Sequence, residues 1–331
     1  MRFILRLLRA IAALLIVVTA VPAILAVFGF AVPAFDLLNH LQLLLFGGTI
    51  VAAVAALVLR MRRWAVGLAL LGFVASGWIF VPEWLSSLPT RPTANGPVLK
   101  LMTHNVFGLN YDMNTVASVI FAEDPDIVAL QEYFPEQQSL DGLLKPRYPY
   151  SVRCQGGKRA NLGLYSKIPF DREMSAADCP ADANGAQRTA HIIAGFTLAD
   201  GTHFSVMTTH MDWPFPIERQ REELAAVAAA ANAVPGPLLV VGDFNSTPWS
   251  YAMKGFEAAT GLHRETRNLL TFPELFTVPH RIARDGLLHT VPFLPLDQVF
   301  ERGVTVTELH RGTRTGSDHL PVIFTFAVPK D

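Results

Sequence analysis

Three long apolar stretches near the N-terminus constrain the fold of this chain more than any other feature of its sequence. They span residues 11–33, 37–59 and 64–85, and their interiors carry no charged side chain. A helix of about 20 apolar residues crosses about 30 Å of hydrocarbon. A charged residue at the centre of a bilayer costs about 2.5–3.5 kcal/mol. The sequence therefore predicts three transmembrane helices within residues 1–85.

The same stretches have two weaker interpretations. Each could be a buried helix of a large soluble protein, but three of them in the first 90 residues, separated only by short turns, favour membrane spans. The first stretch also resembles a cleaved signal peptide, with arginines before it and small residues at Ala20–Ala23. Its apolar part exceeds the about 7–15 residues usual in such peptides, so we expect an uncleaved anchor.

The arginines of this region predict its orientation. They fall before the first stretch and between the second and the third: Arg2, Arg6, Arg9, Arg60, Arg62 and Arg63. The turn between the first two stretches contains Asp36 and no basic residue. Because basic residues flanking membrane spans remain in the cytoplasm, we expect a cytoplasmic N-terminus, and a multi-pass membrane protein whose remaining chain is extracytoplasmic.

Composition supports a division into an apolar front and a water-soluble remainder. The 331 residues are 51% hydrophobic and only 17% charged, with a mean hydropathy of +0.31, which excludes a disordered chain and a wholly soluble globule. The net charge of −1 excludes a strongly basic protein that holds nucleic acid by bulk electrostatics. The two cysteines exclude a disulfide-dense scaffold and a four-cysteine zinc site.

We predict a membrane anchor at residues 1–85, a linker rich in Pro, Gly and small polar residues at 86–97, and a soluble domain at 98–331. In the soluble part, β-like runs alternate with helical ones. Strands are expected at 98–105, 127–131, 162–166, 189–197, 204–209, 238–242, 296–300, 304–308 and 321–326, and helices at 115–123 and 218–233. Many strands with few helices favour an α/β sandwich over an alternating Rossmann fold.

Polar side chains recur where these predicted strands begin or end. They are Asn105, Glu132, His210, Asp243, Asn245, Asp297, Asp318 and His319. Strand ends are rigid platforms on which side chains from distant parts of a sequence converge. Each residue has a structural alternative, such as a turn or a solvated strand end, but the whole series in this order favours a functional site.

These residue types suit metal-assisted hydrolysis of a phosphoester. Mg²⁺ prefers oxygen ligands and commonly binds one or two carboxylates, for which Glu132 and Asp318 are the best candidates. The carboxylate of Asp243 can accept a proton from an attacking water, and a histidine held by a carboxylate can transfer a proton near neutral pH. Asn245 and His210 can donate hydrogen bonds to phosphate oxygens.

With these residues in this order, the sequence resembles the endonuclease/exonuclease/phosphatase superfamily over about residues 98–329. The matching motifs are Thr-His-Asn105, Leu-Gln-Glu132, Thr-His210, Gly-Asp243-Phe-Asn245-Ser-Thr-Pro, Leu-Asp297-Gln-Val-Phe and Gly-Ser-Asp318-His319-Leu-Pro-Val. The family includes deoxyribonucleases, apurinic-site nucleases, neutral sphingomyelinases and inositol-phosphate 5-phosphatases. The apolar front is similar to the anchors of some bacterial members.

The resemblance implies a fold and a cofactor. The fold would be a four-layer α/β sandwich, with two packed mixed sheets and outer helices, preceded here by three transmembrane helices. The cofactor would be Mg²⁺, with Mn²⁺ as an alternative. Glu132 and Asp318 would bind the metal with Asn105 beside it.

The resemblance also implies catalytic roles. Asp243 would orient or deprotonate the water, and Asn245 would hold the phosphate. His319 would contact the phosphate or act as the base, oriented by Asp297. His210 occupies the position that is His in the deoxyribonuclease-like members.

Two basic residues are expected to contact the substrate. Lys167, in Tyr-Ser-Lys-Ile-Pro, stands where many members have Arg, and it keeps the charge but loses bidentate geometry. Arg188 adds a further positive charge in the soluble part.

Three functions remain open from the sequence. The first is a membrane-anchored phosphodiesterase or nuclease, and the second is a hydrolase of lipid headgroups at the bilayer. The third is a non-catalytic membrane binding module. Residues 91–331 carry a net charge of −5, which argues against tight non-specific DNA binding. The expected partners are a phosphoester, from nucleic acid or lipid, and the bilayer itself, and no obligate protein partner is inferred.

The two cysteines, Cys154 and Cys179, both fall in loop-like stretches of the soluble part. A disulfide between them is expected if that part faces an oxidising compartment, and two free thiols are the alternative.

Overall fold

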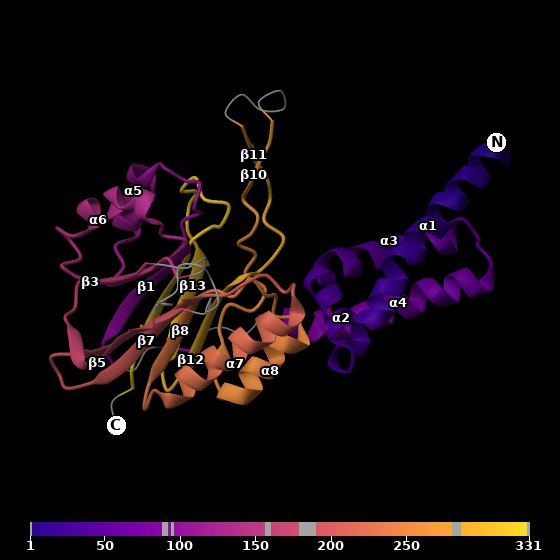
Figure 1. The fold of residues 1–331 in the computed structure, drawn as a ribbon. Coiled ribbons are helices and arrows are strands. Elements are labelled where there is room, and N and C mark those ends of the chain that lie inside the picture. The colour runs from indigo at the N-terminus through magenta and orange to yellow at the C-terminus, as the bar shows by residue number, and fades with distance from the viewer. Residues whose placement is uncertain are drawn as a thin grey trace. The chain divides into compact units, whose positions relative to one another are not determined.

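The chain folds into two compact units in the computed structural model, which describes residues 2–87, 92–93, 96–155, 160–178, 190–279 and 286–329 (Figure 1). The first unit comprises Met1–Pro89 together with Thr247–Gly255. The second comprises Thr90–Ser246 and Phe256–Asp331. A short segment from the C-terminal half of the sequence therefore folds as part of the N-terminal unit.

Long apolar helices form the first unit. In order they are α1 (Arg2–Val27), η1 (Phe28–Phe30), α2 (Pro33–Asp36), η2 (Leu37–Leu41), α3 (Gln42–Val58) and α4 (Arg63–Ser86). The stretches Arg2–Phe30, Pro33–Val58 and Arg63–Ser86 are each long and apolar enough to cross a membrane. The first helix begins earlier than expected and includes the three N-terminal arginines, because Arg and Leu are good helix formers.

Small side chains allow these helices to pack closely. Alanines lie buried where the helices meet: Ala20, Ala23, Ala52, Ala56, Ala65 and Ala69. Many large apolar side chains point outward instead: Leu14, Val54, Leu71, Val74 and Trp78. Small residues inside and large apolar residues outside are the arrangement that helices adopt in lipid.

A series of hydrogen bonds between buried polar side chains connects the helices of the first unit. Asn39 donates hydrogen bonds to Asp36 Oδ1 at 2.7 Å and to the Ala26 carbonyl at 3.2 Å. Gln42 donates to Asn39 Oδ1 at 2.8 Å, and Ser76 on α4 donates to Gln42 Oε1 at 2.8 Å. Polar groups in an apolar interior are costly unless they are paired, so this chain of hydrogen bonds ties the helices together.

The segment Thr247–Gly255 makes specific contacts within the first unit. The carboxylate of Asp36 accepts hydrogen bonds from the backbone amides of Tyr251 at 2.8 Å and Ala252 at 2.9 Å, in the first turn of α8 (Tyr251–Thr260). A carboxylate at this place stabilises a helix by satisfying its unpaired amides and its dipole. Trp249 is fully buried, and its ring lies 5.7 Å from that of Phe80.

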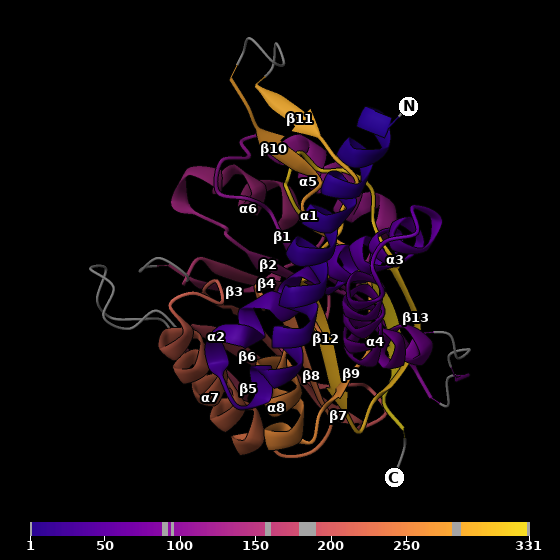
Figure 2. The same ribbon diagram turned by 90° about the vertical axis from the view of Figure 1, so that its right-hand side faces the viewer.

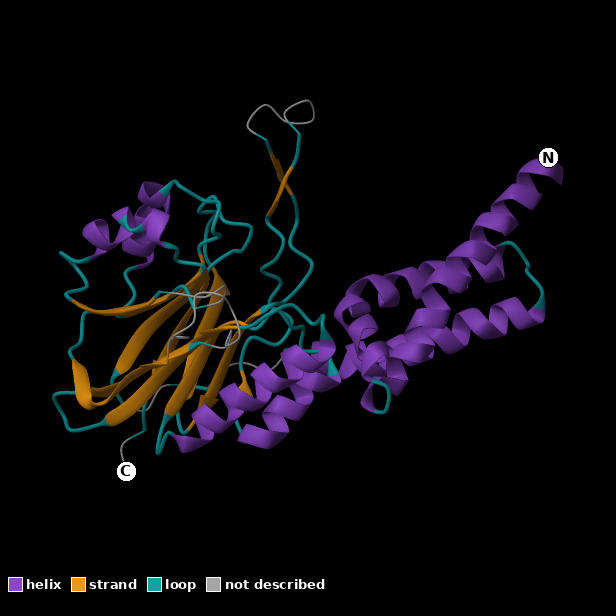
Figure 3. Cartoon of the chain, in the orientation of Figure 1, coloured by secondary structure: helices purple, strands orange, loops and turns teal. Residues whose placement is uncertain are grey.

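Two six-stranded mixed sheets form the second unit (Figure 3). The first has the order β13-β14-β1-β2-β4-β3 and the second the order β5-β6-β7-β8-β12-β9. The strands of the first sheet are β1 (Val98–Asn105), β2 (Ile127–Gln131), β3 (Tyr150–Cys154), β4 (Leu162–Ser166), β13 (Thr305–Arg311) and β14 (Val322–Ala327). Those of the second are β5 (Phe170–Asp178), β6 (His191–Thr197), β7 (His203–His210), β8 (Leu238–Asp243), β9 (His263–Arg264) and β12 (Asp297–Arg302).

Successive side chains along the strands point to opposite faces of the sheet, and this alternation produces the layers of the second unit. Leu101 and Ile127 enter the core between the sheets, whereas their neighbours Met102 and Val128 face the opposite side and pack with α5 (Met113–Glu123) and α6 (Ser139–Leu144). The helix α7 (Ile217–Ala233) lies on the outer side of the second sheet (Figure 2). The predicted four-layer sandwich is confirmed.

Several elements were not predicted from the sequence. They are α6, α8, η3 (Pro135–Gln137), the strands β3, β5 and β9, and a separate two-stranded sheet of β10 (Leu275–Thr277) and β11 (Leu287–His289). Most are short or lack a clean hydrophobic period. Cys154 on β3 is disulfide-bonded, and the only other cysteine in the sequence, Cys179, lies outside the described residues.

Candidate active site

Strand ends from both sheets carry the candidate site of the second unit. The parallel strands β1 and β2 end together, with Asn105 opposite Gln131. The parallel strands β7 and β8 also end together, with His210 opposite Asp243, and β12 begins with Asp297 opposite the same Asp243. The register of the sheets therefore brings polar residues from distant parts of the sequence to the same strand ends.

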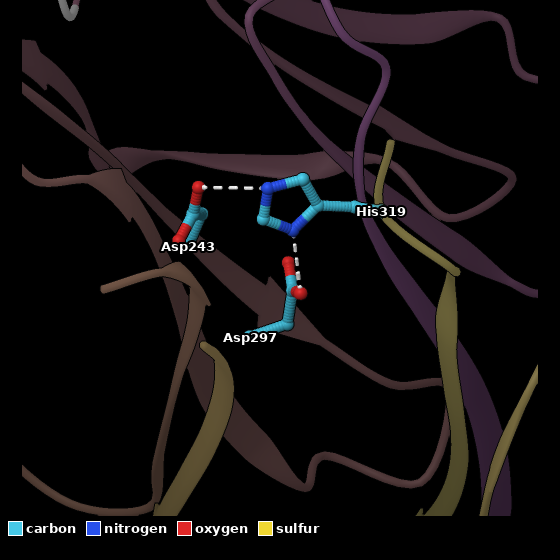
Figure 4. A group of neighbouring side chains, drawn as sticks. All are labelled: Asp243, Asp297 and His319. Atoms are coloured by element: carbon cyan, nitrogen blue, oxygen red, sulfur yellow. Dashed lines mark hydrogen bonds and ion pairs between the residues drawn. The ribbon is translucent and has the colours of Figure 1, made fainter. Parts of the chain in front are cut away.

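His319 lies between two buried carboxylates (Figure 4). Its Nδ1 is 2.8 Å from Asp297 Oδ2, and its Nε2 is 3.6 Å from Asp243 Oδ2. Burial by itself lowers the pKa of His319, but the charges of Asp297 and Asp243 outweigh burial and raise this pKa to about 10. The imidazole is therefore protonated at neutral pH, which suits it to bind an anion.

Asp243 is held by hydrogen-bond donors on two sides. Its Oδ2 accepts from Asn105 Nδ2 at 3.0 Å, and its Oδ1 accepts from the backbone amide of Asn245 at 2.8 Å. Burial raises the pKa of Asp243 to about 7, with the negative charge of Asp297 adding to the rise and His319 opposing it. A carboxylate with such a pKa can accept a proton near neutral pH.

Asn245 and His210 complete this side of the site. Asn245 has a φ of +47°, a left-handed conformation that Asn tolerates better than most residues. Its Nδ2 donates to the Met211 carbonyl at 2.9 Å and lies 3.4 Å from His210 Nε2. The same His210 nitrogen lies 3.6 Å from Asp243 Oδ2 and 3.8 Å from Glu132 Oε1.

Glu132 and Asp318 supply two further carboxylates. Glu132 Oε2 accepts a hydrogen bond from the Gly108 amide at 2.8 Å. Burial raises the pKa of Asp318 to about 6, and repulsion by Glu132 adds to the rise. Asp318 Oδ1 is buried and has no hydrogen-bond partner among the described residues. Two mutually repelling carboxylates, one with an unpaired buried oxygen, fit a divalent cation that prefers oxygen ligands.

A second group of potential ligands lies beside these residues. One ligand atom each from Asp243, Asp297 and His319 fall within 4.8 Å of one another. Both imidazole nitrogens already face a carboxylate, so this group is arranged as an ion-paired histidine rather than as a chelate. Glu132 and Asp318 therefore suit a cation better.

The structure brings together most of the residues expected at the site. Direct contacts link Asn105, Glu132, His210, Asp243, Asn245, Asp297 and His319, and Asp318 interacts electrostatically with three of them, His319, Glu132 and Asp297.

The two predicted substrate-binding residues are not part of this group. Lys167 follows β4, whose Ser166 pairs with Ile127 at the start of β2, whereas Glu132 follows the end of β2. Lys167 therefore lies at the opposite end of the strands from Glu132, where its Nζ pairs with Asp124 Oδ1 at 2.5 Å. Arg188 lies outside the described residues.

Three supporting residues were missed. Ser317 Oγ accepts from the His319 amide at 3.0 Å and donates to the Asn105 carbonyl at 2.7 Å, and its place before Asp318 in the motif could have revealed it. The Phe272 ring lies 4.7 Å from that of His319. Gly242 has a φ of +141°, and a Cβ there would collide with the Thr209 carbonyl, so only glycine fits beside Asp243.

Comparisons with known proteins agree with this architecture. A model of the Endonuclease/Exonuclease/phosphatase family matches residues 102–319. A UPF0294 protein of Vibrio vulnificus is 29% identical over 137 residues, which cover 41% of this chain and 44% of that relative. The chain thus matches less than half of the length of this relative.

Solved structures share the fold. A family protein from Bacteroides thetaiotaomicron superposes with a TM-score of 0.54 at 18% identity, covering 71% of this chain and 96% of that chain. A mannosyl-6-phosphatase from the same organism superposes with a TM-score of 0.52 at 18% identity, covering 69% of this chain and 99% of that chain.

Proposed function

This chain belongs to the endonuclease/exonuclease/phosphatase family, and from this premise we propose that it is a membrane-anchored, divalent-metal-dependent phosphoester hydrolase of the phosphodiesterase or endonuclease type. The observation that carries the proposal is the buried His319 between Asp297 and Asp243, next to two carboxylates suited to a cation. A binding module has no need of buried charges that are costly to maintain. Catalysis is therefore favoured over the non-catalytic alternative.

The residues divide the chemistry between them. Asp243 accepts a proton from the attacking water, because its raised pKa makes it a base of suitable strength. The protonated His319 binds a phosphoryl oxygen and stabilises negative charge there, while Asp297 holds the ring in place. Asn245 and His210 donate further hydrogen bonds to the phosphate.

Glu132 and Asp318 would hold the cation, with Asn105 beside them, and Mg²⁺ suits their oxygen atoms. A bound divalent cation supplies neutralisation of the charge that develops on the phosphoryl group. Asn105 also donates to Asp243 Oδ2 at 3.0 Å, so its amide helps to position the general base.

Lipid headgroups are the second candidate substrate. The helices that are apolar enough to cross a membrane favour this substrate, because they would keep the hydrolase beside the bilayer. The net charge of −5 on residues 91–331 weakens the case for a nuclease that binds DNA without local cations.

Metal-dependent turnover tests the proposed activity. The full chain in detergent is expected to hydrolyse bis(p-nitrophenyl) phosphate with Mg²⁺ or Mn²⁺ and to lose that activity with a chelator. Plasmid DNA and phosphatidylcholine vesicles, assayed in parallel, distinguish the nuclease from the headgroup hydrolase. Metal-independent turnover, or no turnover on any of the three substrates, would contradict the proposal.

We also propose that the hydrolase unit is extracytoplasmic. The arginines in the N-terminal part of α1 and in the turn between α3 and α4 support this orientation, and so does the disulfide at Cys154, since disulfides persist outside the reducing cytoplasm. A C-terminal fusion to a reporter that is active only in the cytoplasm is expected to be silent. A matched fusion after Arg62 should be active, and the reverse pattern would reject this orientation.

A further inference from the structure

A basic pocket opens in the first unit at the end opposite to the turn that carries Asp36. It has a volume of about 260 Å³ and is lined by Arg9, Ala13, Arg60, Met61, Arg62, Trp64 and Ala65. These residues come from the first part of α1, the turn after α3 and the first turn of α4. The pocket is thus formed where the first part of α1 meets the turn between α3 and α4.

We propose that this pocket binds the headgroup of an anionic phospholipid. Three guanidinium groups line it and no carboxylate does in the described part of the chain. Arginine presents a planar fork of donors that matches a phosphate, and it is less strongly hydrated than lysine. A basic pocket between membrane helices has the charge that anionic headgroups need.

The remaining lining residues favour a lipid over a free phosphate. Ala13, Met61 and Ala65 supply an apolar wall, which suits the glycerol backbone and the first carbons of the acyl chains. Trp64 is largely exposed at the same place, as aromatic residues at a membrane interface commonly are. A phosphate ion would gain nothing from this apolar wall.

One hydrogen bond and one helix end hold positive charge in the pocket. Arg9 Nε donates to the Leu59 carbonyl at 3.1 Å, beyond the end of α3. This bond fixes one guanidinium beside the turn that carries the other two. The positive end of the α4 dipole borders the same space and favours an anion there. The inference is independent of the proposed hydrolysis, since none of these residues belongs to the candidate active site.

Lipid binding by the full chain in detergent tests the proposal, with native mass spectrometry counting bound molecules. Phosphatidylglycerol is expected to bind at least about tenfold more tightly than phosphatidylcholine, given the contribution of each arginine near an anionic surface. The double variant Arg60→Gln/Arg62→Gln should lose most of this preference. The control Arg2→Gln/Arg6→Gln removes the same charge outside the pocket and should keep it.

A second variant tests the space in the pocket separately from the charge of its arginines. Ala13→Phe fills the space and leaves all arginines in place, so it should also reduce binding of phosphatidylglycerol. Equal loss in the Arg2→Gln/Arg6→Gln control would show bulk attraction and overturn the proposal. Retained binding in both pocket variants would overturn it too, as would equally effective competition by glycerol 3-phosphate, which lacks acyl chains.

Discussion

Replacing Asp243 by Asn is expected to lower kcat by at least about 10²-fold, the smaller end of the range for a positioned acid or base. The amide has nearly the same shape as the carboxylate, but its single oxygen can accept from only one of the two donors, the Asn105 side chain on Oδ2 or the Asn245 backbone amide on Oδ1. The capacity to accept a proton is lost as well. Steady-state hydrolysis of bis(p-nitrophenyl) phosphate with saturating Mg²⁺ measures the effect.

The pH profile separates proton transfer from simple damage to the site. Asp243 acts only when ionised, and burial raises its pKa to about 7, so kcat/KM should rise as pH increases through an acid limb at or below 7. A nearby cation favours the carboxylate and can only move this limb to lower pH. The control Asp200→Asn, in an exposed turn, should leave the rate and the limb unchanged. A near-normal rate in Asp243→Asn would reject the assignment of the base.

Replacing His319 by Gln is expected to lower kcat by a similar factor, at least about 10²-fold. Glutamine can still donate a hydrogen bond, but it cannot carry the positive charge that the two flanking carboxylates maintain on the imidazole. The same assay measures the loss. His203→Gln, at an exposed position at the start of β7, is the matched control and should retain full activity.

Asp297 distinguishes an electrostatic role of His319 from a merely structural one. In Asp297→Asn the imidazole loses the closer of its two carboxylates, so the raised pKa of His319 should fall. The alkaline limb of the pH profile, where the imidazolium is lost, should then move to lower pH. An alkaline limb that stays in place while the rate falls would mean that Asp297 serves packing alone.

Much of the candidate site could be predicted from the sequence because the polar residues at strand ends are easy to recognise. A buried run such as Leu238–Asp243 indicates both the strand and the polar residue at its tip. The parallel pairing of β7 with β8 then determines that His210 and Asp243 meet. Pairing of this kind follows from the family resemblance, and hydrophobic pattern alone does not specify which strands become neighbours.

Other features depend on tertiary contacts that leave no periodic signal. Lys167 was expected near the substrate from its motif, but the preceding strand β4 runs antiparallel to β2 and places Lys167 at the other end of the strands, away from Glu132. Ser317 and Phe272 act on His319 through single contacts that no spacing rule describes. The raised pKa values of Asp243 and Asp318 arise from burial, which only the folded chain defines.

The membership of Thr247–Gly255 in the N-terminal unit has a practical consequence for anyone who wishes to dissect this protein. Cleaving the chain near residue 90 would not yield two self-sufficient pieces, since the excised C-terminal fragment would carry Trp249 and the start of α8 away from Phe80 and Asp36. The segment that loses its contacts begins at Thr247, only two residues beyond the site residue Asn245. Measurements on a truncated, detergent-free fragment would therefore describe a protein that lacks part of its native packing.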